Sequence, residues 1–269
     1  MLFQVSIIIN YSLQVVWIAL QIIVAIFLLF KMLKTKRYNL LPLILFLIFS
    51  SVRIIFLVTV PALRPIYLVL VQFPNLLLVI FTKLTFFKYR KSPFTIFVLI
   101  LIIVRTIDFI IRLNYNITVP MTSELSESNL LYYYYILFSI SISYLLSHGW
   151  LGFVSIRYYW TLRSERIAPW IKKRYLLIAI SSLIYCLSIF IYYLFPYHNV
   201  DIYAYPNIIY SYILVGLTIF YSIGMFIAWI MPQKLKRYFD KDFQLGEEQE
   251  FTEEELMERI NRERNISEE

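Results

Sequence analysis

The chain alternates long apolar runs with short polar segments over most of its length. Seven runs reach the length of about 20 residues that an α-helix needs to cross the hydrocarbon core of a bilayer. These runs cover residues 5–30, 40–60, 66–87, 94–113, 130–158, 175–195 and 206–231. The first and fifth are longer than a bilayer requires, so we expect those helices to tilt or to extend beyond it. The pattern predicts an all-α polytopic membrane protein with a bundle of seven transmembrane helices.

Composition supports this class. The 269 residues are 60% hydrophobic, with a mean hydropathy of +0.70, which is more than a soluble core of this size uses. The first run is too long for the core of a cleavable signal peptide, so we expect it to be retained as a span. Cys186 is the only cysteine, which excludes an intrachain disulfide and a cysteine-based metal site. We predict no metal and no cofactor.

Basic residues mark every second loop. Seventeen of the 25 Lys and Arg residues lie around the loops after runs 1, 3 and 5 and in the segment after run 7, whereas the other loops hold only Arg64, with Arg112 at a span end. The positive-inside rule then places the N-terminus outside or in a lumen and the C-terminus in the cytosol. The net charge of +8 has the same explanation, so we predict no nucleic-acid partner. Asn116 begins the sequence Asn-Ile-Thr in the fourth loop, which predicts glycosylation on the luminal side.

The chain changes character after the seventh run. Residues 233–245 carry aromatic and apolar residues at helical spacing among Lys and Arg, which predicts a short amphipathic helix on the membrane surface. Residues 246–269 are rich in Glu and predict a solvated, partly helical acidic tail, with a docking helix as the alternative. We therefore divide the chain into a transmembrane domain over residues 1–232, the juxtamembrane helix and the cytosolic tail.

Two charged residues, Arg105 and Asp108, lie well inside the fourth run. A charge at that depth costs about 2.5–3.5 kcal/mol on insertion scales and is seldom left facing lipid. The two residues are three apart and therefore share a helix face. Arg53 in the second run has a similar expected depth, because both spans run from cytosol to lumen. Two interpretations stay open: an internal ion pair that fixes helix packing, or a lumen-facing pocket for an anionic ligand.

Other polar residues in the spans extend this candidate set. Asn75 follows Pro74 in the third run and is expected to contribute a polar contact across the bundle, which makes it a candidate pocket residue with Arg53, Arg105 and Asp108. His148 in the fifth run predicts either a hydrogen-bonded helix contact or a pH-sensing group that titrates near neutral pH. The spans carry no paired-carboxylate site, and the chain has no H-E-x-x-H and no G-x-S-x-G, so we predict that it is not an enzyme.

Several stretches resemble the tobamovirus-multiplication (Tom-like) seven-span family, whose relatives include plant vacuolar-membrane proteins and animal lysosomal proteins once classed as orphan receptors. The resembling stretches are SVRIIF at residues 51–56, QFPNLL at 72–77, GF at 152–153, RY at 157–158, LR at 162–163 and the closing Pro232. The resemblance implies a vacuolar or lysosomal scaffold that recruits small GTPases or replication factors.

The function that we expect is non-enzymatic. We expect the chain to be a receptor-like (GPCR-like) sensor or signalling scaffold in the plasma membrane or in a vacuolar or lysosomal membrane. Such a protein would couple to a cytosolic partner, for example a GTPase or G protein, through loops 3 and 5 and the tail. The alternative is a small-solute or ion transporter that uses Arg53, Arg105 and Asp108. The marks of rhodopsin-class receptors are missing, since the third run ends without an acidic-Arg-Tyr triplet, so G-protein coupling has no motif support.

Overall fold

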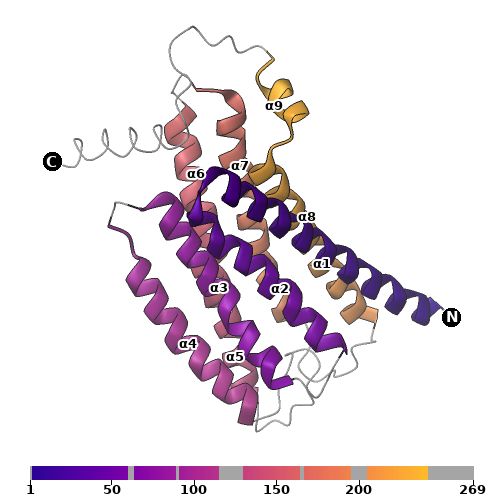
Figure 1. Ribbon diagram of the computed structural model, residues 1–269. Coiled ribbons are helices and arrows are strands. Elements are labelled where there is room, and N and C mark those ends of the chain that lie inside the picture. Colours follow the sequence, from indigo (N-terminus) through magenta and orange to yellow (C-terminus); the bar gives the residue numbers. More distant parts are fainter. Residues whose placement is uncertain are drawn as a thin grey trace.

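The computed structural model describes residues 2–59, 64–88, 91–114, 130–163, 167–194 and 205–241, and these residues form helices with no strand among them (Figure 1). Within them, six helical segments are long and apolar enough to cross a membrane, which indicates an integral membrane protein. These segments are Ser12–Thr35, Pro65–Phe86, Phe94–Asn114, Leu131–Arg163, Pro169–Ile191 and Tyr212–Ile230.

The described helices follow the predicted apolar runs. They are α1 (Leu2–Thr35), the short η1 (Tyr38–Leu40), α2 (Leu41–Thr59), α3 (Arg64–Phe86), α4 (Phe94–Asn114), α5 (Leu130–Tyr144), the π-helical turn η5 (Leu145–Gly149), α6 (Trp150–Arg163), α7 (Pro169–Leu187), the 3₁₀ turn η6 (Ser188–Leu194), α8 (Tyr205–Ile230) and α9 (Gln233–Phe239). The second predicted span coincides with α2, whose described apolar segment, Tyr38–Arg53, is shorter than a membrane span. Six candidate spans are therefore present among the described residues, and the seventh stays a prediction that rests on α2.

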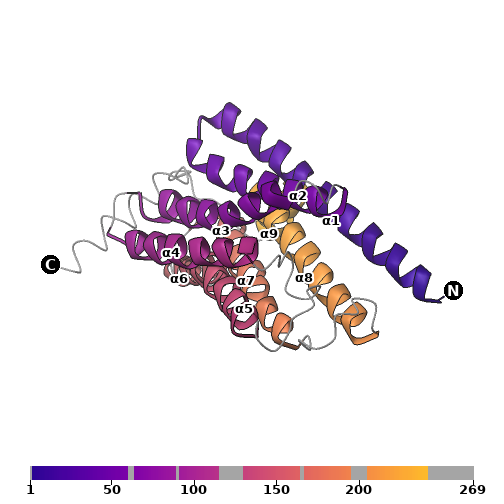
Figure 2. The same cartoon turned by 90° about the horizontal axis from the view of Figure 1, so that it is seen from below.

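The helices pack in the order of the chain and close into a ring (Figures 1 and 2). Each of α1 to α4 packs against the next helix, and α5 continues through η5 into α6. Helix α6 packs against α7, α7 packs against α8, and α8 packs against α1, which closes the ring. Helix α3 also contacts η5 and α6, so it lies inside the ring, whereas α4 packs only against α3 and α5 among its principal neighbours. Helix α4 therefore combines a peripheral position with a charged sequence.

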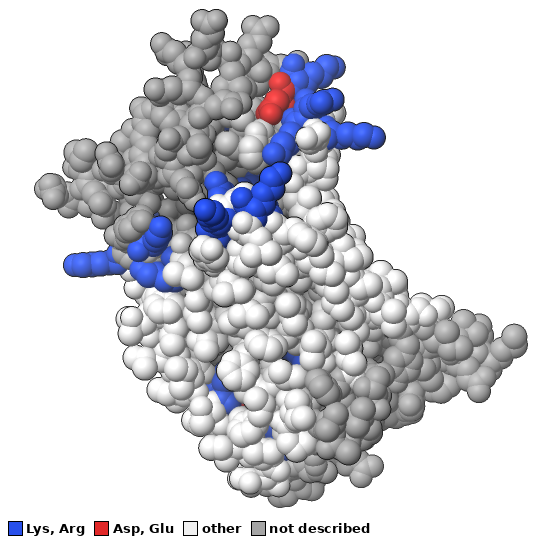
Figure 3. Space-filling model, in the orientation of Figure 1, with Lys and Arg blue, Asp and Glu red and all other residues white. Residues whose placement is uncertain are grey.

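The ends that carry the basic residues lie on one side of the bundle. Lys and Arg gather around α9 at the upper end of the bundle, and further groups lie near the α1–α2 and α3–α4 connections (Figure 3). Within the group around α9, Lys236 lies over the ring of Trp170 in the first turn of α7, at 4.3 Å from the ring centroid, and the Trp170 backbone N–H donates to Asp240 Oδ1 at 3.3 Å. These contacts dock α9 onto α7.

Helix α7 begins six residues earlier than the sequence predicts. Pro169 occupies the first turn, where its missing N–H costs no intrahelical hydrogen bond. The basic residues that the sequence places in loop 5 therefore continue into this helix. Among them, Arg174 is buried with its guanidinium 4.3 Å from the centroid of the Trp229 ring of α8. Its loop assignment was wrong, because a cation–π contact inside the bundle holds this charge.

The segment after the last span is a shorter helix than predicted. Met231 takes a left-handed φ of 41° at the end of α8, Pro232 follows, and α9 ends at Phe239, inside the predicted range of 233–245. Its position on a membrane surface stays a prediction. The acidic tail over residues 246–269 lies outside the described residues.

Candidate functional site

The buried face of α4 is charged. The buried residues of this helix are Leu101, Arg105, Asp108 and Arg112, and their spacing of four, three and four residues places them on one stripe. The opposite face is apolar and exposed, with Ile103, Ile107 and Ile110 at 59%, 42% and 50% exposure. In a bilayer this arrangement turns the apolar face to lipid and the charges toward α3 and α5.

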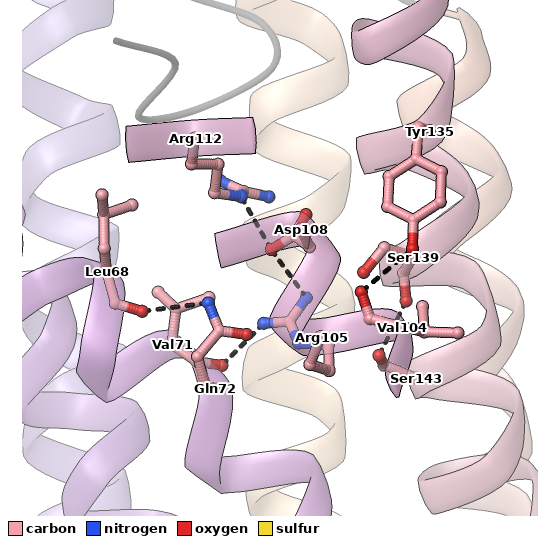
Figure 4. Close-up of polar contacts among 10 residues, drawn as sticks. All are labelled: Leu68, Val71, Gln72, Val104, Arg105, Asp108, Arg112, Tyr135, Ser139 and Ser143. Atoms are coloured by element: carbon pink, nitrogen blue, oxygen red, sulfur yellow. Dashed lines mark hydrogen bonds and ion pairs between the residues drawn. The ribbon is translucent and has the colours of Figure 1, made fainter. Parts of the chain in front are cut away.

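One carboxylate is shared between two arginines (Figure 4). Asp108 Oδ2 lies 2.9 Å from Arg112 Nε and 3.5 Å from Arg105 Nη1, and all three side chains are buried. Asp108 is the only acidic residue in the described transmembrane helices. The Arg105–Asp108 pair follows from the three-residue spacing. Arg112 was missed as a partner because it was treated as a span end, although its spacing of four residues from Asp108 gives the same signal.

Hydrogen bonds tie the charged stripe to both neighbouring helices. Arg105 Nη2 donates to the carbonyl of Val71 in α3 at 2.8 Å, and the Tyr135 hydroxyl of α5 donates to the carbonyl of Val104 at 3.2 Å (Figure 4). Arg105 therefore links Asp108 to the backbone of α3. This geometry supports the interpretation of a packing ion pair and also fixes the direction of the guanidinium.

Arg53 belongs to a different helix from the ion-pair cluster. It belongs to α2, and α3 packs between α2 and α4 (Figure 2). The ion-pair cluster itself is formed by three residues of α4, whereas the sequence had grouped Arg53 with Arg105 and Asp108 on the basis of depth alone.

A pocket of about 290 Å³ lies between α3 and α4. Two of the four candidate residues, Asn75 and Arg105, line it, whereas Arg53 and Asp108 are not among its lining residues. The polar lining is completed by Gln72 and Thr106, and the remaining lining residues are apolar: Val69, Phe73, Leu76, Leu101, Ile102 and Phe109. The stretch QFPNLL at residues 72–77 thus supplies four of the ten lining residues.

Asn75 also connects the pocket to the centre of the bundle. Its side chain is buried, and its Oδ1 accepts a hydrogen bond of 3.0 Å from the Ser147 hydroxyl in η5. This is the polar contact across the bundle that the sequence predicts for Asn75. The donor lies in a π-helical turn, a feature that is frequent at functional sites.

His148, the next residue of this turn, is enclosed by aromatic rings. Its ring centroid lies 5.6 Å from Phe46, 5.3 Å from Tyr144, 4.7 Å from Tyr185 and 5.1 Å from Tyr221, and the side chain is 1% exposed. His148 Nδ1 and the Tyr221 hydroxyl have no hydrogen-bond partner in the described structure. The cluster joins α2, η5, α7 and α8 at one point. Neither the π-helical turn nor the aromatic cluster was predicted, and a pH-sensing role of His148 stays a prediction.

The described residues hold no group of three His, Cys, Asp or Glu side chains that could bind a metal ion. Asn116, the predicted glycosylation site, lies outside the described residues. Comparison of the chain with protein-family models, curated proteins and solved structures gives no match. The resemblance to the Tom-like family therefore rests on the short stretches quoted above and stays a prediction.

Proposed function

We propose that the chain is a non-enzymatic, seven-helix membrane sensor of the receptor-like type, in which a change at the α3–α4 pocket reaches the cytosolic ends of the helices. Coupling to a cytosolic partner such as a GTPase would use loops 3 and 5 and the tail, as in the scaffold role that the Tom-like resemblance implies. The plasma membrane or a vacuolar or lysosomal membrane is the proposed location. The closed ring of helices supports this proposal, since it brings α3 into contact with both the pocket and η5.

The observation that carries the proposal is the position of the Ser147 hydroxyl. It lies 3.0 Å from Asn75 Oδ1, on the pocket wall, and 2.6 Å from the Ser143 carbonyl of its own helix. A hydroxyl has one hydrogen, so it donates fully to only one of these acceptors at a time. The two choices define two discrete arrangements, one with α3 bonded to the π-helical turn and one without. A two-state element of this kind is what coupling between distant sites requires.

The path continues from Ser147 to its neighbour His148 and then to the cytosolic side. The His148 ring contacts Tyr185 of α7 and Tyr221 of α8, and these two tyrosine rings stack at 4.6 Å. Helix α7 carries α9 at its far end through the Trp170 contacts, and α8 leads directly into α9. A shift at η5 is therefore expected to change the positions of α7 and α9, where the basic residues gather.

Asn75→Leu tests this coupling. The substitution removes the acceptor on α3, so the Ser147 hydroxyl keeps only the Ser143 carbonyl. We expect the ends of α3 and α7 to move by about 1–2 Å, the usual size of helix shifts in such transitions. Pulsed electron paramagnetic resonance measures this as the distance between spin labels on the exposed positions Leu84 and Lys173, in the full chain with Cys186→Ala, reconstituted in lipid nanodiscs.

Thr82→Val is the matched control. Thr82 is buried on the same helix, but its hydroxyl bonds only to its own helix at the Leu78 carbonyl. We expect this variant to give the wild-type distance distribution. Superimposable distributions for wild type, Asn75→Leu and the control would contradict the sensor proposal.

The proposed orientation predicts glycosylation of the fourth loop. In eukaryotic cells, we expect Asn116 to carry a glycan that an endoglycosidase removes and that is missing in Asn116→Gln. Because Asn116 is two residues beyond the end of α4, the variant Glu124→Asn provides a second acceptor sequence in the middle of the loop. The sequence Asn-Ile-Ser at residues 265–267, in the proposed cytosolic tail, is an internal control and should stay unmodified. A glycan on the tail together with an unmodified fourth loop would reverse the orientation.

Transport is the alternative function, and the charges within a transmembrane segment are the observation that favours it. Proteoliposomes that contain the full chain would then show a flux of a small anion, and Arg105→Met would abolish it. The sensor proposal predicts no flux above that of empty liposomes.

A further inference from the structure

The α3–α4 pocket opens sideways, toward the space that lipid chains occupy. Its apolar rim includes Val69 and Phe73 on α3 and Ile102 on α4, which are 42%, 43% and 50% exposed. All three lie on transmembrane segments. The mouth of the pocket therefore faces hydrocarbon, so a ligand with an apolar chain can enter it from within the bilayer.

The inner end of the pocket is polar and incompletely satisfied. Arg105 is 5% exposed and uses Nη2 for the Val71 carbonyl and Nη1 for Asp108, which leaves Nε buried without a hydrogen-bond partner (Figure 4). Gln72 donates its amide NH₂ to the Leu68 carbonyl, and its buried Oε1 has no partner. A buried charged donor without a partner costs free energy, so Arg105 Nε favours a ligand group that accepts from it.

The unpartnered atom of Arg105 identifies the ligand group. Asp108 is already shared by Arg105 and Arg112. A carboxylate from the ligand meets the free Nε–H of Arg105, which offers it a charge-assisted hydrogen bond. The ionised carboxylate has no hydrogen to donate, so Arg105 Nε, and not Gln72 Oε1, selects it.

We propose that this pocket binds a long-chain fatty acid from the bilayer, with its carboxyl group at Arg105 and its chain along the apolar walls toward Ile102. The volume of about 290 Å³ is at the small end of ligand pockets, which suits one chain and not a two-chain phospholipid. This assignment rests on the proposed sensor function, for which it names the ligand. Asn75, on the same wall, places the bound chain next to the hydrogen bond to Ser147.

Photolabelling tests the assignment directly. The full chain in phosphatidylcholine nanodiscs is irradiated with a palmitic acid that carries a diazirine in its chain, and the adducts are mapped by mass spectrometry. We expect the adducts to concentrate on the lining residues of α3 and α4 and to be displaced by palmitate. We expect methyl palmitate, which has the same chain but no ionisable group, to compete about tenfold less well, equivalent to about 1.4 kcal/mol.

Matched variants separate the pocket from the surrounding lipid surface. Ile102→Trp fills the mouth, whereas Ile103→Trp adds the same ring at the neighbouring position, which is 59% exposed and is not a lining residue. Arg105→Gln removes the charge and leaves the Asp108–Arg112 pair of 2.9 Å in place, so this variant is expected to fold. We expect Ile102→Trp and Arg105→Gln to reduce pocket labelling about tenfold and Ile103→Trp to leave it unchanged.

Labelling spread evenly around the bundle, equal competition by the methyl ester, or unchanged labelling of Ile102→Trp would overturn the fatty-acid site. The distance between labels on Leu84 and Lys173 separates this result from the sensor function. Pocket labelling without a change of that distance on adding palmitate would keep the site and refute the sensor. The absence of labelling, with the distance change of Asn75→Leu retained, would refute the site and keep the sensor.

Discussion

Replacing Asp108 with alanine should destabilise the protein by about 3–5 kcal/mol, because it leaves the guanidinium groups of Arg105 and Arg112 buried without the carboxylate that they share. The single cysteine provides the measurement. Cys186 is 7% exposed in the folded protein, so its reaction with a thiol-specific fluorophore during heating reports unfolding. We expect the midpoint of this reaction in detergent to fall well below that of the wild type.

Two variants control this prediction. The triple variant with Arg105→Met, Asp108→Leu and Arg112→Met removes all three charges and should unfold closer to the wild type than the single change does. Asp240→Asn alters a carboxylate at the end of the bundle that carries α9, where a hydrogen bond is worth about 1 kcal/mol, and should have a small effect. A wild-type unfolding midpoint for Asp108→Ala would show that the cluster does not stabilise the bundle.

Gly224→Ala should destabilise the contact between α7 and α8. A Cβ at this position would overlap Ser181 Oγ of α7 and lie 2.9 Å from Ser181 Cβ, so one of the two helices must move. Overpacking of this kind costs about 1–3 kcal/mol. The reaction of Cys186 with the fluorophore again measures the loss of stability, and Cys186 itself lies on α7.

Gly216→Ala on the same helix is the control. A Cβ there meets no atom within 4 Å, so we expect this variant to be as stable as the wild type or to gain up to about 1 kcal/mol from the helix propensity of alanine. Adding Ser181→Gly to Gly224→Ala should restore part of the lost stability, because it removes the side chain that the new Cβ meets. Equal unfolding midpoints for the two alanine variants would contradict the close approach of α7 and α8.

Hydrophobicity along the chain predicted the helices because a membrane imposes a minimum length on apolar runs. The run over residues 94–113 matches α4 to within one residue. The prediction failed at α7, where Lys172, Lys173 and Arg174 were taken as a loop, because the average hydropathy of a turn does not show that Arg174 lies against Trp229. The π-helical turn at Leu145–Gly149 has no signal in the sequence pattern, since it depends on how α3 and α7 pack around it.

The sequence predicted the contacts of the site within one helix but not the contacts between helices. Spacing within one helix determines which side chains share a face, so Arg105 and Asp108 could be paired from the sequence, and Arg112 could have been added. Position along a span predicts depth but not direction around the bundle. Arg53 therefore has a suitable depth for Arg105, but it belongs to α2, which is not among the principal neighbours of α4. Asn75 meets Ser147 through packing that only the structure describes.

The central claim is that α4 turns its charges toward α3 and its apolar face toward lipid. Site-directed spin labelling tests it most directly, with labels placed in turn at Leu101, Ile103, Ile107 and Ile110 in the full chain with Cys186→Ala, in lipid nanodiscs. The collision rate of each label with dissolved oxygen, which concentrates in hydrocarbon, reports contact with lipid. We predict high rates at Ile103, Ile107 and Ile110 and a low rate at Leu101, which shares the buried stripe with Arg105 and Asp108. A high rate at Leu101 with low rates at Ile103 and Ile107 would turn the charges toward lipid and contradict the account.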